Sequence, residues 1–457
     1  METAGDQYQK MTQMPVEKLI PRLAAPTMMS MMSAVLYNTA DTWFVSQLGD
    51  SATAATGVCL PLTAMIQAVG FWIGMGAGSN ISRFLGKRHN FKASIIATSA
   101  TALTVLVSLI LGLTGFFGNS LILKHLGSTP TIMPYAADYS KVIFIGTTFS
   151  SLSFVFNNLL RAQGRAVFAM AGVISGTLIN VILDPIFIFV LDLGIAGAAW
   201  STVICQCISF LIMLYALRSE KSMIKLSPAF LSKNYGVYLL IMSTGLPSLF
   251  RQGCSALATV LLNRAGAVYG DTAVAAMSIV GRVSFLITSL VGGFGQGYQP
   301  VVGFAFGAGN YQRVKRAYKF SMTVCLTILT LGGLFCLFKA EAIMRFFRSD
   351  SPQVIAIGTE TFFYYGLSLP FNAVIILTNM LLQVTGQKFL ASLTSVMRQG
   401  VVFIPLILIL PEFIGLKGVE ICQPLSDSVS AAVAISVAVY FFKTLSRKNF
   451  QPKTSHH

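Results

Sequence analysis

The first half of the chain recurs, in altered form, as the second half. Identical residues whose numbers differ by 221 include Pro26 and Pro247, Asp50 and Asp271, Gly74 and Gly295, Gly86 and Gly307, Gly194 and Gly415, and Gly197 and Gly418. For the pairs Asn157 and Asn379, and Gly164 and Gly386, the offset is 222, which a single inserted residue explains. Both halves consist of long apolar segments, so the pattern predicts a duplicated helical membrane protein.

Composition and segment length give the same class. The chain has 457 residues, of which 54% are hydrophobic and 11% are charged, whereas soluble domains are about 25% charged. Apolar runs of about 20 residues are needed to cross a bilayer, and such runs predict an all-α integral membrane protein with twelve transmembrane helices. The predicted spans are 16–46, 52–84, 90–118, 131–160, 165–192 and 194–218 in the first repeat, and 236–266, 271–304, 311–338, 352–384, 388–411 and 416–445 in the second.

The basic residues set the predicted topology. The formal net charge is +16, and most Lys and Arg residues fall on one side when the N-terminus is placed inside. The positive-inside rule then predicts that both termini are cytoplasmic, and the charge requires no nucleic-acid partner. Because each repeat has an even number of spans, the two repeats are parallel and not inverted. The basic residues on the inner side lie in segments 10–22, 83–92, 161–165, 218–233, 313–319 and 443–453 and at Lys388.

The predicted organisation follows from these boundaries. A polar cytoplasmic tail (1–15) precedes an N-lobe (16–218), a cytoplasmic linker (219–235), a C-lobe (236–445) and a cytoplasmic tail (446–457). The first fifteen residues are polar and the first apolar span is full length, so we expect no cleavable signal. We expect a monomer in the cytoplasmic (inner) membrane, in contact with the lipid bilayer.

Two acids lie within spans of the first repeat, where ionisable residues indicate function. Asp41 lies one helical turn after Tyr37, and Asp184 one turn after Asn180, so each acid shares a helix face with a polar partner. At an offset of 221, Asp41 would fall on Leu262 and Asp184 near Pro405, so the second repeat lacks both acids. Further polar candidates within the N-lobe spans are Asn157, Thr202 and Gln206.

Two functional interpretations of the acids remain open beside a structural one. A carboxylic acid among apolar helices keeps its proton more readily than in water, so the pair could load and release protons. Alternatively, the carboxylates and the oxygens of Asn157, Asn180 and Thr202 are hard ligands that suit Na⁺. In the structural interpretation, Asp41 caps the end of its span and Asp184 turns the chain at Pro185.

The second repeat carries basic residues within its spans. Buried charges are usually paired, so Arg251, Arg282 and Arg398 favour a structural ion-pair network with Glu360 and Asp427; a second, cation-sensitive relay is the alternative. Pro26 and Pro247 interrupt the hydrogen bonding of long helices and are candidate hinges. The glycine-rich stretches 74–78 and 292–297 lie within apolar spans and indicate close helix packing.

Several of these residues together resemble the multidrug and toxic compound extrusion (MATE) family, and within it the MepA- and DinF-like branch. They are Asp41, Asn157, Arg161–Gly164, Asn180, Asp184, Gly194–Ala199 and Gly295–Pro300. The resemblance covers residues 16–445 and implies two six-helix lobes arranged in a V around a central cleft. It implies export of bulky hydrophobic, often cationic, drugs in exchange for protons or Na⁺. The seventh span departs from the NorM branch because it has no acid at its middle.

The resemblance also implies roles for individual residues. Asp41 would be the principal coupling carboxylate and Asp184 its partner, and Pro26 would mark a bend in the first span. Residues that would complete the ion site are Tyr37, Asn157, Asn180 and Thr202. Candidates for the substrate cleft are Gln206, Arg251, Arg282, Asn379 and Gln383.

We therefore expect a cation-coupled multidrug efflux antiporter with H⁺ or Na⁺ as the coupling ion and no other cofactor. The alternative is a flippase or exporter of a lipid-linked or other amphipathic metabolite, for which Arg251 and Arg282 could bind the anionic group. An enzyme is disfavoured because His89, His125, His456 and His457 all lie in loops or in the tail, and no metal-binding pattern accompanies them.

Overall fold

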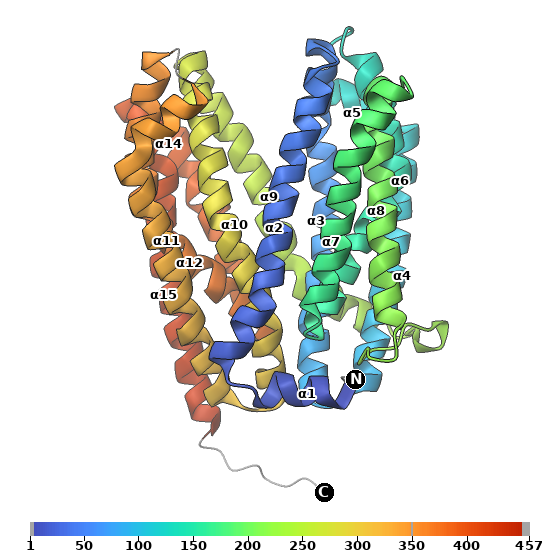
Figure 1. Ribbon diagram of the computed structural model, residues 1–457. Helices are drawn as coiled ribbons and strands as arrows, with labels where there is room; N and C mark the ends of the chain where they lie inside the picture. Colours follow the sequence, from blue (N-terminus) through green and yellow to red (C-terminus); the bar gives the residue numbers. More distant parts are fainter. Residues whose placement is uncertain (1–3, 349–350, 450–457) are drawn as a thin grey trace, which may run out of the picture.

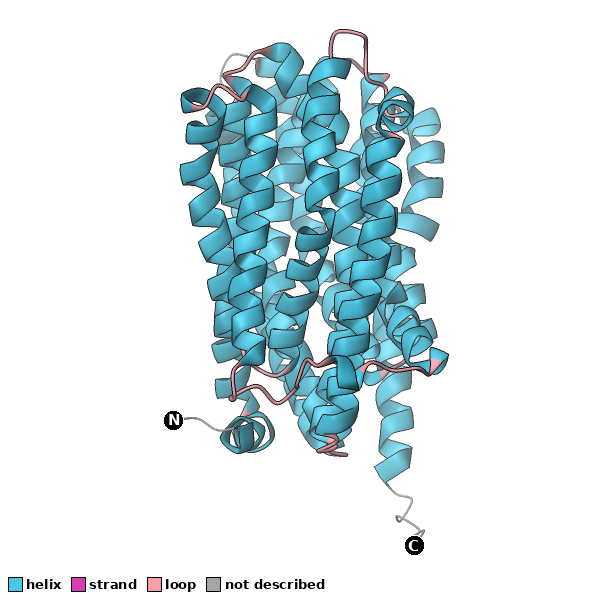
Figure 2. Cartoon of the chain, turned by 90° about the vertical axis from the view of Figure 1, so that its right-hand side faces the viewer, coloured by secondary structure: helices cyan, strands magenta, loops and turns pink. Residues whose placement is uncertain are grey.

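The computed structural model describes residues 4–348 and 351–449, and every long element in these ranges is a helix. Figure 1 shows the helices in two groups, with α1 and the last turns of α15 at the same end of the molecule. In the side view of Figure 2 the long helices run nearly parallel, and the loops gather at the two ends. From residue 450 on, the predicted C-terminal tail lies outside the described residues.

The first repeat forms six long helices after a short one. In chain order the elements are α1 (Ala4–Gln13), α2 (Val16–Ser46), α3 (Asp50–Gly86), α4 (Asn90–Phe117), the short α5 (Asn119–His125), α6 (Met133–Ala162), α7 (Ala166–Pro185), which continues as a π-helical turn over Ile186–Val190, and α8 (Gly194–Arg218).

The second repeat has the same order. Its elements are α9 (Tyr235–Ala267), α10 (Asp271–Gly307), α11 (Tyr311–Phe347), α12 (Pro352–Thr385), α13 (Lys388–Val396), which passes through a π-helical turn over Met397–Val401 into α14 (Phe403–Ile414), and α15 (Leu416–Asn449). The span predicted at 388–411 is thus one path with a π-helical turn in its middle.

Among the described residues, eleven helices are long and apolar enough to cross a membrane. Helix α9 is not among the eleven, but it occupies in the second repeat the position that α2 occupies in the first. With α9 the count is the predicted twelve, and the predicted all-α membrane fold is confirmed.

The duplication extends to the turns between helices. Gly49 and Gly270, at matching positions, have φ of +104° and +93° and precede α3 and α10. Gly164 and Gly386 have φ of +78° and +83° at the ends of α6 and α12. L-residues with a Cβ rarely adopt these angles, so both halves use glycine at the same corners.

The two lobes meet along a seam in which each contact occurs twice, once from each repeat. A Cβ on Gly86 would lie 2.3 Å from the carbonyl oxygen of Phe304, and a Cβ on Gly307 would lie 2.1 Å from that of Arg83. Positions 83 and 304 are themselves related by the repeat offset, so each contact is the counterpart of the other. In the same way Gly76 packs against α9 at Gly245, and Gly297 packs against α2 at Ala24. The close packing predicted from the glycine-rich stretches is confirmed at these positions.

The seam covers only the half of the helices nearer to α1. In the other half, a Cβ on Gly57 of α3, Gly253 of α9 or Gly281 of α10 would meet no atom within 4 Å. Figure 1 shows the two groups of helices diverging towards the end opposite α1. The lobes therefore touch at the end that carries the N-terminus and separate towards the other end.

Helix α1 lies across the closed end, within the residues that the sequence indicated as a polar tail. In the N-lobe, Gln7 donates to the carbonyl oxygens of Gln163 and Gly164 (3.2 and 3.1 Å). In the C-lobe, Arg313 donates to the carbonyl oxygens of Met11 and Met14 (3.1 and 2.6 Å) at the end of α1. Residues 4–13 thus tie the two lobes together.

Candidate functional site

A hydrogen-bonded cluster surrounds Asp184 at the end of α7. Asp184 is fully buried, and its Oδ1 accepts hydrogen bonds from Ser201 Oγ (2.5 Å) and from Asn180 Nδ2 (3.1 Å). Asn180 Nδ2 also donates to Ser201 Oγ (2.7 Å). Asn180 lies on α7 one turn before Asp184, as predicted, and Ser201 comes from α8. The cluster therefore joins two helices of the N-lobe through neutral donors.

Helix α2 brings the second acid to this cluster. The hydroxyl of Tyr37 shares a hydrogen bond with that of Thr202 (3.2 Å), so α2 contacts α8 beside Ser201. Asp41, one turn further along α2, interacts electrostatically with Asp184. Residues from α2, α7 and α8 thus form one polar site, in which the structure brings together Tyr37, Asp41, Asn180, Asp184 and Thr202.

The site has more acceptor oxygens than the protein satisfies. Asp41 Oδ1, Asp184 Oδ2 and Asn180 Oδ1 are buried and accept no hydrogen bond. Within residues 4–348 and 351–449, neither carboxylate has a Lys or Arg within ion-pair distance. An unsatisfied buried carboxylate is costly, and binding of a proton or a small cation to these oxygens would relieve that cost. The described residues contain no group of three His, Cys, Asp or Glu side chains that could hold a metal ion.

Asn157 has a different place from the one expected. Its Nδ2 donates to the carbonyl oxygen of Ala169 (3.4 Å) and thereby ties α6 to α7. Its counterpart Asn379 donates to the carbonyl oxygen of Ala391 (2.8 Å), at the same spacing along the chain. The structure thus gives both asparagines the same role, which is to fasten two consecutive helices of a lobe.

The substrate-cleft candidates divide into two groups. Gln383 is buried, and its Nε2 donates to the Thr244 carbonyl oxygen (3.1 Å) and to Ser248 Oγ (2.9 Å), so that it holds α12 to α9. Asn379 is committed in the same way.

Arg251 is partly exposed and Arg282 is exposed on α10, and neither has a carboxylate within ion-pair distance in the described part of the chain. Gln206 lies on α8 one turn after Thr202 and is partly exposed.

The C-lobe contains a buried ion pair. Asp427 on α15 accepts from Arg398 Nε (2.6 Å), from Gln423 Nε2 (2.8 Å) and from Asn372 Nδ2 (2.8 Å). Arg398 stands in the π-helical turn that leads into α14. Glu360, the other acid predicted as a partner for the arginines, pairs with Lys417 instead (3.4 Å), near the end of the lobe opposite α1. The structure therefore pairs one of the three arginines with an acid.

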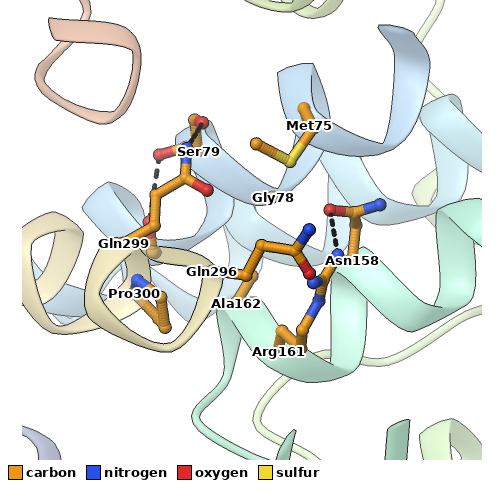
Figure 3. Close-up of a pocket in the computed structure, with 10 residues that line it drawn as sticks. Met75, Gly78, Ser79, Asn158, Arg161, Ala162, Gln296, Gln299 and Pro300 are labelled. Atoms are coloured by element: carbon orange, nitrogen blue, oxygen red, sulfur yellow. Dashed lines mark hydrogen bonds between the residues drawn. The ribbon is translucent and has the colours of Figure 1, made fainter. Parts of the chain in front are cut away.

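A small cavity of about 20 Å³ lies between the lobes near the closed end, where α3 and α6 face α10 (Figure 3). Arg161, which is 7% exposed, donates to Asn158 Oδ1 (2.8 Å), and Gln296 of the C-lobe points toward it. Gln299 Nε2 donates across the seam to Ser79 Oγ (3.5 Å). A cavity of this size has room for about one water molecule. Two segments of the resemblance, Arg161–Gly164 and Gly295–Pro300, thus lie at the closed seam and not at the acids.

Comparison with known proteins gives the family. The MatE family model matches residues 26–186 and 245–409, which is more than half of the chain and one segment in each repeat. The chain belongs to the MatE family.

This MatE chain has relatives along nearly its whole length. It is 27% identical to the multidrug export protein MepA of Staphylococcus haemolyticus over 430 residues, 92% of each chain. It is 26% identical to MepA of Staphylococcus aureus strain MRSA252 over 436 residues, 94% of each chain. Among solved structures, it superposes with a TM-score of 0.92 on the outward-facing conformation of a multidrug resistance MATE family transporter of the MOP superfamily, at 24% identity and with coverage of 98% and 100%. The predicted family is confirmed, and so is the prediction that the chain is not an enzyme.

Two polar residues of this MatE protein were missing from the sequence prediction. Ser201 lies on α8 one turn after Gly197, where the structure shows close packing, because a Cβ there would lie 2.5 Å from the Phe187 carbonyl oxygen. A small polar residue on such a closely packed face points at the neighbouring helix. Glu420 on α15 is 2% exposed, its Oε2 has no hydrogen-bond partner, and it interacts electrostatically with Glu360 and Lys417.

The candidate hinges of the MatE fold both lie inside helices. Pro26 is in α2, and Pro247 is in α9. Directly after Pro26, Thr27 donates to the carbonyl oxygen of Gly293 on α10 (2.6 Å). Helix α2 is therefore hydrogen-bonded to α10 of the opposite lobe beside its proline and, through Tyr37 and Thr202, to α8 of the N-lobe further along.

Proposed function

We propose that this MatE protein is a cation-coupled multidrug antiporter, which exports hydrophobic, often cationic, compounds in exchange for H⁺ or Na⁺. The observation that carries the proposal is the pair of acids Asp41 and Asp184. They lie in membrane-spanning helices, they interact with each other, and no basic side chain of the described residues neutralises them. Ionisable residues of this kind mark ion pathways. The names of the relatives, multidrug export proteins, support a drug as the transported substrate.

Helix α2 is the element through which the ion would act. When a proton or Na⁺ binds between Asp41 and Asp184, the mutual repulsion of the carboxylates falls and α2 can approach α7 and α8. The same helix is bonded to α10 of the other lobe by Thr27. A change at the acids is therefore transmitted to the seam, provided that the ion binds the two conformations with different affinity.

Opening towards the other side requires the closed end to part. The glycine contacts of the seam and the hydrogen bonds of α1 to both lobes would have to break. We place this end on the cytoplasmic side of the cytoplasmic membrane, because the basic loops lie there. Both termini would then be cytoplasmic. We propose that the protein acts as a monomer. The described conformation is then closed to the cytoplasm, with the lobes apart on the outer side.

A cationic substrate can compete with the ion. It would be attracted by the same two carboxylates, and its departure would leave them free to be protonated or to bind Na⁺. Exchange then needs no direct contact between drug and ion, because each requires the site that the other occupies.

A second candidate function rests on Arg251 and Arg282. Both arginines lie on α9 and α10 without a carboxylate partner in the described part of the chain, and a guanidinium binds phosphate well. A lipid-linked or other anionic amphipathic metabolite would use them, and export of such a compound would be independent of Asp41.

The test is export of ethidium or norfloxacin from proteoliposomes under an imposed pH gradient and, separately, an imposed Na⁺ gradient. The variants are wild type, Asp41→Asn and, as a matched control, Asp138→Asn, which changes an exposed acid on α6. We expect one gradient to drive export by wild type and the control, and Asp41→Asn to export nothing. Export by Asp41→Asn at the wild-type rate would refute the coupling proposal. Absence of export by wild type under both gradients would favour the anionic metabolite.

A further inference from the structure

A groove runs along the surface of the C-lobe at the end that carries α1. It has a volume of about 600 Å³ and lies between α11 and α15, with α12 behind it. Its walls are apolar, with Met322 and Leu326 on α11 and Ile435, Val439 and Phe442 on α15. At its base the ring of Tyr318 contacts that of Phe442 (5.1 Å between centroids), and the Tyr318 hydroxyl is bonded to Thr378 (2.9 Å).

The charged residues that line the groove all have the same sign. Lys315 and Lys319, one turn apart on α11, converge with Lys443 of α15, and all three are exposed. No acid of the described residues lines the groove. The positive-inside rule explains why lysines lie at this end of the protein. It does not explain why lysines from two helices far apart in the sequence converge on one apolar groove.

The duplication shows what covers the corresponding face of the N-lobe. There the linker lies along α4: the backbone N–H of Lys225 donates to Ser94 Oγ (2.9 Å), and that of Ser232 donates to Ser99 Oγ (3.2 Å). The ring of Phe230 packs against that of Phe91 (5.6 Å). Met223 and Ile224 of the linker are buried as a result. In the first repeat this face is therefore covered by the chain itself.

The second repeat lacks the residues that hold such a cover. Where the repeat offset places the counterparts of Ser94 and Ser99, the chain has Lys315 and Phe320. The hydroxyls that accept the backbone of the linker are thus replaced by a cation and an aromatic ring. Residues 450–457 contain Lys453 and neither Asp nor Glu, so their side chains offer no charge complement to the three lysines.

We propose that the groove binds an anionic phospholipid of the cytoplasmic leaflet. The phosphate headgroup would lie among Lys315, Lys319 and Lys443, and an acyl chain would lie along Leu326, Ile435 and Val439. Apolar walls with a cationic end match this amphiphile in both parts, and basic pockets between helices on the cytoplasmic side are typical sites for anionic headgroups. The headgroup would lie at Lys315, the counterpart of Ser94, which in the N-lobe accepts from the linker backbone.

Thermal unfolding of the full-length protein in detergent tests this site. Five of the seven cysteines are buried, so a thiol-reactive dye reports unfolding. We expect phosphatidylglycerol to raise the melting temperature of wild type by roughly 5 °C, because a ligand well above its dissociation constant stabilises the folded state. Phosphatidylcholine with the same acyl chains should raise it by less than half as much.

Matched variants locate the effect. The combined change Lys315→Gln, Lys319→Gln and Lys443→Gln should abolish most of the shift. The combined change Lys87→Gln, Lys92→Gln and Lys221→Gln removes the same charge from exposed N-lobe sites at the same end and should preserve it. Val439→Trp, which fills the groove, should also reduce the shift.

Three results of the melting experiment would overturn the proposal. If both triple variants lost the phosphatidylglycerol-induced rise in melting temperature to the same extent, the lipid would be attracted to the basic surface in general and not to the groove. A full shift in Val439→Trp would exclude the groove. A shift that appears only after removal of residues 450–457 would assign the groove to the tail. If the C-lobe triple variant does not fold, native mass spectrometry of Lys319→Gln should show fewer bound phosphatidylglycerol molecules than wild type, and an equal number would refute the site. None of these outcomes depends on drug transport.

Discussion

Asp184 in the first lobe and Asp427 in the second are both buried carboxylates, but their neighbours differ in charge. Asp184 accepts from a hydroxyl and an amide and lies near a second acid. Asp427 accepts from a guanidinium and two amides. The counterpart of Asp427 in the first repeat is Gln206, so the second lobe has an acid where the first has a neutral residue, and it carries the matching base within reach.

The difference shows that the two lobes, which share one fold, use a buried acid in two ways. A carboxylate with its own arginine is neutralised permanently and holds α15 to the turn before α14. A carboxylate without one can be neutralised only by an ion from solution. Replacement of an acid should therefore affect transport in one lobe and stability in the other.

The largest effect is expected from Asp184→Asn. The amide keeps an oxygen that can accept from Ser201 and Asn180, so the fold should be preserved, but it cannot bind a proton or a cation electrostatically. We expect ion-driven export to fall at least about 100-fold, equivalent to about 2.7 kcal/mol, with an unchanged melting temperature. Initial rates in proteoliposomes measure this. Retained export would mean that Asp184 is structural and that the contrast between the lobes is false.

Asp427→Asn should give the opposite pattern. It leaves Arg398 without its carboxylate, and removing one partner of a buried ion pair costs about 3 kcal/mol or more. We expect a large loss of thermal stability in detergent, while the folded fraction still exports drug under the ion gradient. Adding Arg398→Gln should restore part of the stability, because it removes the unpaired charge. A stable Asp427→Asn variant that cannot export would place ion coupling in the C-lobe as well.

Substitution of a seam glycine should cost the same stability in either lobe. Gly86→Ala and Gly307→Ala each press a methyl group against a carbonyl of the other lobe, and overpacking typically costs about 1–3 kcal/mol. Because the two positions are counterparts, we expect their losses of melting temperature to agree closely. Gly253→Ala, where the added carbon meets no atom within 4 Å, is the control. Clearly unequal losses would contradict the symmetry of the seam.

The smallest effect is expected from Ser201→Ala, which removes one hydrogen bond from Asp184. A hydrogen bond to a charged group contributes about 1.5 kcal/mol, so the ion concentration for half-maximal export should shift about tenfold. Ser209→Ala removes a buried hydroxyl from the same helix, one that donates to the Gly172 carbonyl oxygen (2.9 Å), and should leave that concentration unchanged. Equal behaviour of the two variants would remove Ser201 from the ion site.

Much of the architecture was predictable from the sequence. Apolar runs, glycine spacing and the positions of lysines and arginines are properties of chain segments, so they gave the spans and the repeat without any knowledge of packing. The two acids stood out because carboxylates are rare within apolar helices. Helix α1 was not predicted, because a short polar segment shows no apolar period and is held by contacts to both lobes.

The pairing of polar side chains was not predictable. Asn379 and Gln383 looked free to face a substrate, but their amide nitrogens donate to neighbouring helices. Arg398 pairs with Asp427 from within a π-helical turn, and the sequence did not show which of the candidate acids it would meet. Ser201 was overlooked because serine is common in spans, and only the approach of α7 gives it a role.

The doubled seam has a consequence for the history of the chain. Contacts of residue 86 on 304 and of 307 on 83 have the form of an isologous interface, in which one patch meets a second copy of itself. A six-helix protein with either half's pattern could bury this patch only by pairing with an identical partner, so the present fold has the design of a homodimer whose subunits were later joined by residues 219–234. In such a fused pair the seam contacts involve both copies equally, whereas the acids Asp41 and Asp184 belong to the first copy and the Arg398–Asp427 ion pair to the second.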